Sequence, residues 1–127
     1  MKLIPTLRCK DINLSLEFYT KVLGFGIKFT HAPDGQIGYA GIEKDGCEIH
    51  LSRHEGGWGT IVYVEVDEVD LLFREFVKRG LDNSHKKESP VHQGPTDQTW
   101  GMREFYIDDP SGNTLRFGCI LDGNTQD

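Results

Sequence analysis

The chain has 127 residues, of which 37% are hydrophobic and 27% charged, and its 14 Lys and Arg against 20 Asp and Glu give a formal net charge of −6. This balance indicates one globular domain and excludes a disordered, collagen-like or membrane-spanning chain. The acidic charge argues against nucleic acid as a partner, and it would attract a cationic small molecule. Cys9, Cys47 and Cys119 form no CxxC pair, so we expect reduced thiols and a cytoplasmic protein.

The sequence repeats one plan twice. Residues 3–9 are strand-like and precede Asp11 and a helical segment that ends at Gly24, while residues 60–66 precede Asp67 and a helical segment that ends at Gly80. The two Asp-to-Gly spans are equal (24 − 11 = 13 and 80 − 67 = 13). Each Asp is predicted to be a helix N-cap and each Gly a left-handed C-cap.

Further strand-like runs follow each helix. They are expected at residues 25–30, 36–42 and 47–52 in the first half and at 102–107 and 114–119 in the second, with one short strand in the polar segment 81–101. We therefore predict an α+β fold of two tandem βαβββ modules in a single domain, 1–127, with repeat 1 at about 1–55 and repeat 2 at about 58–121. Helices on one face would leave a curved mixed sheet whose other face forms a ligand cleft.

His50 is the leading polar candidate. Strand alternation places Glu48 and His50 on one face of the segment 47–52, and Arg116 occupies the position equivalent to His50 in the second half. Glu48, His50 and His54 could supply metal ligands, although residues four apart on a strand do not converge cleanly. A hydrogen-bonded strand histidine is the favoured interpretation, and Cys9 is predicted to be a packed thiol.

Several aromatic residues lie away from the expected helix stripes. Flat rings suit stacking against a heteroaromatic or cationic ligand, and ordinary core filling is the alternative. The Gly-rich segment 55–59 lacks a phosphate-binding motif, so we expect a loop that exposes its tryptophan. The aromatic candidates are Phe29, Tyr39, Trp58, Tyr63 and Trp100.

Two motifs resemble the vicinal oxygen chelate superfamily of glyoxalases, bleomycin resistance proteins and dioxygenases. The first is Asp11-Ile12 with Glu17-Phe18-Tyr19 and Val22-Leu23-Gly24-Phe25, and the second is the turn 108–113, Asp-Asp-Pro-Ser-Gly-Asn. Within the superfamily, Pro5, Ile49-His50-Leu51 and the segment 100–105, Trp-Gly-Met-Arg-Glu-Phe, look most like bleomycin resistance proteins.

This resemblance implies a homodimer that sequesters a bleomycin-type glycopeptide in grooves between subunits, without catalysis and without a cofactor. Phe29, Tyr39, Tyr63 and Trp100 would line the groove, and Pro5 would hinge an N-terminal strand exchanged between subunits. The enzymes of the superfamily hold a metal at strand positions that correspond here to Pro5, His50, Ile61 and Arg116, of which only His50 has a side chain that could bind a metal.

The sequence therefore predicts a binding protein for a cationic, aromatic antibiotic, with no catalytic residue and no metal ligand. Two alternatives stay open: a metal-dependent glyoxalase-like lyase or thiol transferase, and a module for another aromatic small molecule. The predicted ligand-binding residues are Phe29, Tyr39, His50, Trp58, Tyr63, Trp100 and Arg116.

Overall fold

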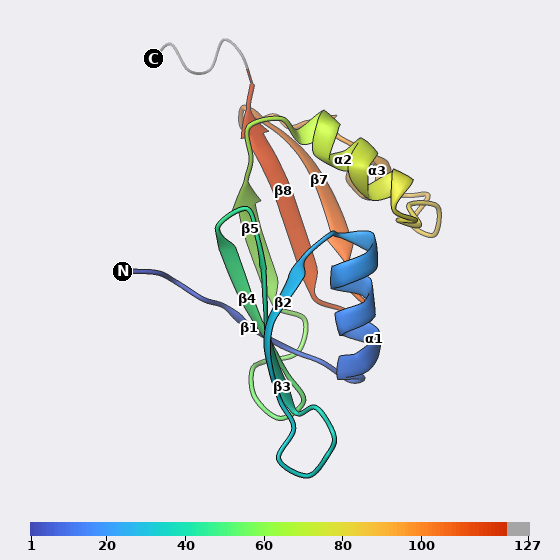
Figure 1. The fold of residues 1–127 in the computed structure, drawn as a ribbon. Helices are drawn as coiled ribbons and strands as arrows, with labels where there is room; N and C mark the ends of the chain where they lie inside the picture. Colours follow the sequence, from blue (N-terminus) through green and yellow to red (C-terminus); the bar gives the residue numbers. More distant parts are fainter. Residues whose placement is uncertain (122–127) are drawn as a thin grey trace. The chain divides into compact units, whose positions relative to one another are not determined.

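Two βαβββ modules follow one another in the computed structural model, which describes residues 1–121 (Figure 1). The predicted α+β fold of tandem modules is confirmed, while the ligand cleft, the dimer and the domain limits stay predictions; residues 122–127 of the predicted domain lie outside the described residues. The elements are β1 (Thr6–Arg8), α1 (Ile12–Glu17), the π-helical turn η1 (Phe18–Val22), β2 (Gly26–His31), β3 (Tyr39–Lys44), β4 (Cys47–Ser52), β5 (Ile61–Glu65), α2 (Val69–Lys78), α3 (Pro90–Gln93), β6 (Thr96–Asp97), β7 (Met102–Asp108) and β8 (Thr114–Ile120).

The strands form two four-stranded sheets with the same internal order. The first sheet runs β1-β4-β3-β2 and the second β5-β8-β7-β6. In each, the first strand pairs in parallel with the last one, so that Thr6 lies opposite His50 and Tyr63 opposite Arg116. Two compact units result, Met1–Thr60 with Asp108–Asn113, and Ile61–Ile107 with the residues from Thr114 on.

Capping differs between the two helices. Asp11 caps α1 as predicted, because its carboxylate accepts from the backbone N–H groups of Asn13 and Leu14. The predicted cap Asp67 is wrong: Glu68 is the N-cap of α2 and makes no side-chain capping bond. Instead, the first helical residue, Val69, is buried, so packing anchors this end of the helix. Gly24 and Gly80 both end their helices at positive φ, of 75° and 105°, as expected.

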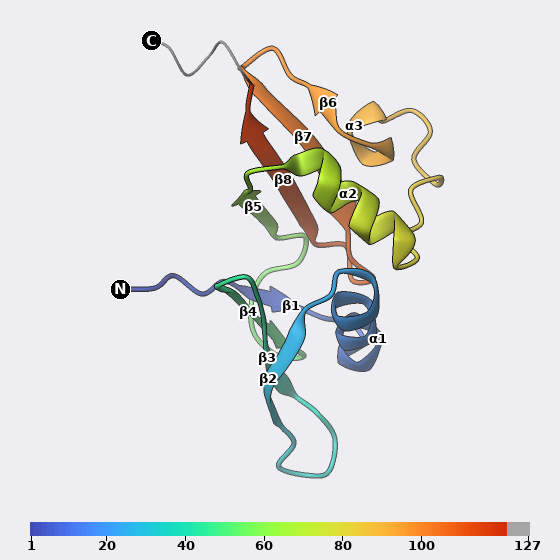
Figure 2. The same cartoon turned by 45° about the horizontal axis from the view of Figure 1, so that its top comes forward.

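The helix α2 covers one face of the second sheet (Figure 2). Phe76 of α2 contacts the rings of Phe105 on β7 and Phe117 on β8, with ring centroids 6.1 and 5.4 Å apart. Since side chains alternate along a strand, Glu104 and Arg116 point to the opposite face. In the first unit, α1 contacts β4, and the buried residues include Leu7, Leu16, Tyr19, Leu23, Ala40, Ile42, Ile49 and Leu51.

The turn between β7 and β8 is organised around one buried carboxylate. Asp109 accepts hydrogen bonds from the backbone N–H groups of Ser111 and Asn113 at 2.8 and 2.9 Å. Its other oxygen accepts from the Tyr19 hydroxyl at 2.8 Å. Asn113 in turn donates to the carbonyl of Arg8 and accepts from the N–H of Thr60. The two sequence motifs of the superfamily resemblance are thus joined by the bond between Tyr19 and Asp109.

The segment 81–101 contains the expected short strand, β6, and a helix that the sequence interpretation missed, α3, which begins at Pro90. Proline at the first helical position costs no hydrogen bond, since that N–H has no partner within the helix. Of the described helices, none is both long and apolar enough to cross a membrane.

Replacing Tyr19 with phenylalanine should lower the free energy of unfolding by about 1–3 kcal/mol, because the buried Asp109 carboxylate loses a donor. Urea denaturation followed by circular dichroism measures the change. Leu14→Ala, at an exposed position of α1, is the control and should change stability far less. An unfolding free energy equal to that of the native chain would show that the bond does not stabilise the turn.

Candidate functional site

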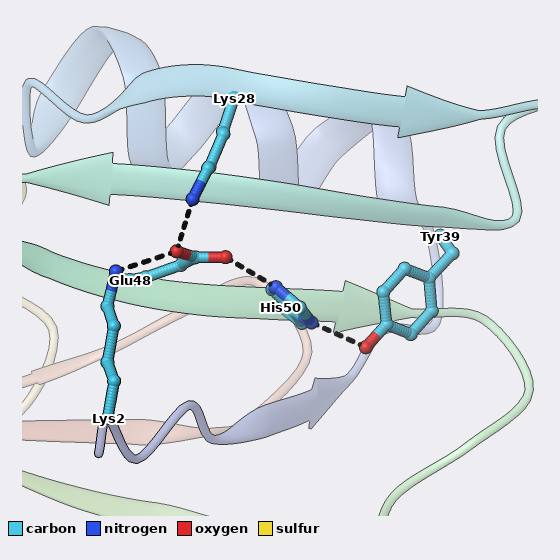
Figure 3. Close-up of polar contacts among 5 residues, drawn as sticks. All are labelled: Lys2, Lys28, Tyr39, Glu48 and His50. Carbon is cyan, nitrogen blue, oxygen red and sulfur yellow. Dashed lines mark hydrogen bonds and ion pairs between the residues drawn. The ribbon is translucent and has the colours of Figure 1, made fainter.

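Glu48 on β4 is buried on the first sheet and bonded to three side chains, each from a different segment. Its Oε1 accepts from Nζ of Lys2 and from Nζ of Lys28, each at 2.8 Å, and its Oε2 lies 2.7 Å from Nε2 of His50 (Figure 3). The other ring nitrogen of His50, Nδ1, lies 2.7 Å from the hydroxyl of Tyr39. We call Lys2, Lys28, Tyr39, Glu48 and His50 the Glu48 cluster.

The proton positions in the Glu48 cluster follow from the chemistry of the groups. An ionised carboxylate only accepts, so Nε2 of His50 must donate to Glu48. In the neutral imidazole Nδ1 is then an acceptor, and the Tyr39 hydroxyl donates to it. Both ring nitrogens are thus engaged, and the histidine is held in one tautomer.

The surroundings of Glu48 favour its charged form. Hydrogen bonds from Lys2, Lys28 and His50 lower the pKa of Glu48 from 4.5 to about 2. The side chains of Lys2 and Lys28 are about half exposed, whereas that of Glu48 is only 4% exposed. With two lysines and one carboxylate the cluster carries a charge of 2 − 1 = +1 when His50 is neutral, so the charge it presents to solvent is positive.

An aromatic surface borders the Glu48 cluster. The Phe29 ring stacks with Tyr39 at 6.1 Å between centroids and meets His50 edge-on at 5.3 Å. Phe29 lies opposite Gly41 in the register of β2 and β3, and a Cβ atom on Gly41 would collide with the Phe29 ring. Glycine therefore lets the ring lie directly on the neighbouring strand, where 39% of Phe29 stays exposed.

The second sheet carries a similar arrangement around Glu104 on β7, which is only 2% exposed. Its Oε2 accepts from the Tyr63 hydroxyl at 2.6 Å and from Nε1 of Trp100 at 3.3 Å, and its Oε1 accepts from the Tyr106 hydroxyl at 3.1 Å. We call Tyr63, Trp100, Glu104 and Tyr106 the Glu104 cluster. Its donors are neutral, whereas two of those around Glu48 are cationic.

The two tyrosines of the Glu104 cluster are hard to ionise. Burial and the hydrogen bond to Glu104 raise the pKa of Tyr63 above its usual range, and the same two causes raise the pKa of Tyr106. Gly118 makes room for this contact, because a Cβ atom there would collide with the Tyr63 hydroxyl. Tyr63 and Trp100 nevertheless stay 45% and 62% exposed.

The structure brings six of the seven predicted site residues together in two groups of three and leaves Trp58 apart from both. Phe29, Tyr39 and His50 meet at the Glu48 cluster. Tyr63 and Trp100 both bond Glu104, and the Arg116 guanidinium lies 4.6 Å from the ring centre of Tyr106. Trp58 stands apart in its loop, 56% exposed as expected, with the Arg8 guanidinium 4.8 Å from its ring. Cys9 is buried, as predicted for a packed thiol.

Sequence reasoning missed Glu104, Tyr106, Lys2 and Lys28 as members of these clusters. A signal was present for Glu104, which lies within the segment 100–105 that carries the resemblance. None marked the lysines, because only folding brings Lys2 and Lys28 to the same oxygen, from positions 46 and 20 residues away along the chain from Glu48.

The side chains do not fit the metal centre found in enzymes of related fold. Among residues 1–121, no three His, Cys, Asp or Glu side chains gather where they could hold a metal ion. His50 already uses both ring nitrogens, and Glu48 is bonded by three donors. The polar side chains of these strands thus form a hydrogen-bonded surface and do not form a set of metal ligands.

The tandem modules and the two carboxylate clusters on their sheets define a protein of the paired βαβββ class. The chain belongs to the Glyoxalase/Bleomycin resistance protein/Dioxygenase superfamily, whose family model matches residues 4–117. This confirms the superfamily resemblance seen in the sequence. No curated protein matches the chain.

Solved structures with the same fold include antibiotic-binding proteins. TioX from Micromonospora sp. ML1 has a TM-score of 0.75 and 22% identity, over 95% of this chain and 99% of that one. The bleomycin-binding protein of Streptomyces verticillus, solved with copper(II)-bleomycin, has a TM-score of 0.70 and 26% identity, over 92% and 93% of the two chains. A bleomycin resistance determinant encoded on the transposon Tn5 has a TM-score of 0.75 and 21% identity, over 94% and 98%.

Glu48→Gln should flatten the dependence of stability on acid pH. The native pKa of Glu48 lies at about 2, below its ordinary 4.5, so ionised Glu48 stabilises the fold above pH 4.5, and this contribution is lost as the pH falls toward 2. Urea titrations across that interval measure the slope, with Glu43→Gln, at an exposed strand position, as the control. Equal slopes for the native chain and Glu48→Gln would contradict the assigned pKa.

Glu104→Gln should make Tyr63 and Tyr106 ionise at lower pH, because the neighbouring negative charge that opposes ionisation is removed. The raised pKa values persist in part, since burial also contributes. Ultraviolet absorbance of tyrosinate during alkaline titration measures the change. Glu48→Gln is the matched control, since Glu48 bonds no tyrosine directly; an unshifted titration in Glu104→Gln would refute the electrostatic coupling.

Proposed function

We propose that this protein binds a bleomycin-type antibiotic, or a chemically similar aromatic natural product, and sequesters it without chemical change. One observation carries the proposal: each sheet has a buried carboxylate satisfied by donors from its own chain, with partly exposed aromatic rings beside it. Rings that are held in place before the ligand arrives lose little entropy on binding.

The hydrogen bonding supports binding rather than catalysis. In the Glu48 cluster, His50 has no unbonded ring nitrogen, and its partner Glu48 is held in the ionised form. In the Glu104 cluster, the hydroxyls of Tyr63 and Tyr106 are consumed as donors to Glu104, and their raised pKa values disfavour a phenolate. Groups committed in this way are poor general bases or nucleophiles.

The comparisons support the same proposal. The Streptomyces verticillus protein, at 26% identity over nearly the whole length of both chains, was solved with copper(II)-bleomycin. In the same proposal the binding unit is a homodimer; the strand β1 that Pro5 would hinge for exchange pairs with β4 of its own chain in the single chain that the structure describes. Exposed apolar residues, Leu3, Ile27 and Ile61 among them, favour a covered surface in the working assembly.

A titration with bleomycin tests the function. After treatment with a chelator, metal-free and copper-loaded bleomycin are each added while tryptophan fluorescence is recorded, and the mass of the complex is measured by sedimentation. We expect saturable quenching at one ligand per chain in a particle of twice the chain mass. No response to either form rejects the antibiotic proposal, and stoichiometric metal in the isolated protein would then favour the enzyme alternative.

Trp100→Ala should weaken bleomycin binding by about 1–3 kcal/mol, because an exposed ring available for stacking is lost. Calorimetric titration measures the affinity, and circular dichroism verifies the fold. Leu71→Ala is the matched control, since Leu71 is 51% exposed on α2 and belongs to neither cluster. Native affinity in the Trp100 variant would remove Trp100 from the binding surface.

A further inference from the structure

The Arg116 side chain in the second sheet lacks a partner for its charge. Its Nε atom is buried and makes no hydrogen bond, and within the part of the chain that the structure describes no carboxylate lies within ion-pair distance. The guanidinium instead lies over the ring of Tyr106, 4.6 Å from its centroid. Nε of Arg8 is also buried without a hydrogen bond. The Arg8 guanidinium, however, donates through Nη1 to the carbonyl of Gly56.

The nearby carboxylate does not neutralise this arginine. Tyr63 lies opposite Arg116 in the register of β5 and β8, and its hydroxyl donates to Glu104. Tyr106 separates the two charges, since its hydroxyl bonds Glu104 while its ring lies under the guanidinium. Trp100 is the third hydrogen-bond donor to Glu104, so this carboxylate is already satisfied. The N–H groups of Arg116 are therefore available to an acceptor from a ligand.

We propose that Arg116 binds the carboxylate of an aromatic or heteroaromatic acid, whose ring stacks beside Tyr63 and Trp100. Guanidinium is planar and can donate two parallel hydrogen bonds to a carboxylate, and its stacking on Tyr106 holds the plane in place. The exposed rings of Tyr63 and Trp100 belong to the same cluster. This inference goes beyond the proposed function, because it gives the second sheet a ligand group of its own.

The charge around Arg116 favours a ligand of the opposite charge to the one that the net charge of the whole chain favours. A net charge of −6 favours a cationic ligand at long range. At short range the Glu104 carboxylate is enclosed by its own donors, and the cation of Arg116 is the group that lacks a counter-charge. Burying the Nε–H donor of Arg116 without an acceptor is costly, so an anionic ligand group that accepts from it would relieve that cost.

The test uses the full chain and two probes of nearly equal shape, naphthoate and its neutral amide, in which an NH2 donor replaces one carboxylate oxygen. The indole N–H signals of the two tryptophans are followed by heteronuclear NMR, and Trp58→Phe assigns the signal of Trp100. We expect naphthoate to shift the Trp100 signal saturably and to bind at least about tenfold more weakly to Arg116→Gln, since a charged hydrogen bond is lost. Naphthamide should bind weakly and equally to both.

Two further variants keep the result decisive. Arg74→Gln removes one positive charge from an exposed position of α2 and should leave naphthoate binding unchanged. Arg116→Lys keeps the positive charge but loses the planar guanidinium, so it should bind naphthoate with intermediate affinity. If Arg116→Gln does not fold, the affinity of Arg116→Lys tests the inference in its place. Equal affinity in Arg116→Gln and the native chain, equal binding of acid and amide, or no shift of the Trp100 signal overturns the inference.

Bleomycin binding by the same variants separates this inference from the proposed function. Bleomycin bound by the native chain, with no effect of naphthoate on Trp100, leaves the antibiotic proposal standing and rejects the carboxylate site. Naphthoate bound through Arg116, with no response to bleomycin, supports the site and rejects the antibiotic proposal.

Discussion

A carboxylate buried on a sheet must be surrounded by hydrogen-bond donors, and this constraint shapes both halves of the molecule. Glu48 and Glu104 are each almost fully buried, and each accepts from three side chains. Because two of the three donors in each cluster come from other segments of the chain, a shift in strand register would leave the carboxylate short of donors, at a cost of about 1–3 kcal/mol. The hydrogen bonds that satisfy the buried carboxylates thus also hold the aromatic rings in position.

Two glycines make room for the aromatic rings beside the carboxylates. Gly41 and Gly118 lie where a neighbouring aromatic side chain crosses the strand, and any Cβ atom would collide with Phe29 or Tyr63. In the second unit the rings of Phe76, Phe105 and Phe117 pack between α2 and one side of the sheet, so the polar cluster occupies the other side. The result in each unit is a preformed surface of rings around an enclosed carboxylate, which suits recognition of a flat ligand.

The two modules share a plan but differ in charge. Lysines satisfy the carboxylate of the first unit, whereas tyrosines and a tryptophan satisfy that of the second, where Arg116 lies on Tyr106 without a counter-charge. A duplicated fold has thus diverged into two chemically distinct surfaces. Such divergence is how one fold serves many functions.

Local signals in the sequence were enough to determine the tandem modules, the Asp11 cap and the left-handed Gly24 and Gly80, because each depends on residues within a few positions. The cap predicted at Asp67 failed because burial of Val69, a tertiary effect, anchors the start of α2. The aromatic candidates and His50 could be named from composition and alternation, and alternation also placed Glu48 on the face of His50, but the partners on other segments could not be named. Tyr63 and Glu104 are 41 residues apart and Lys2 and Glu48 are 46 apart. Only strand pairing brings such residues within bonding distance, so the tertiary structure alone decided which carboxylates are enclosed and which cation is left without a partner.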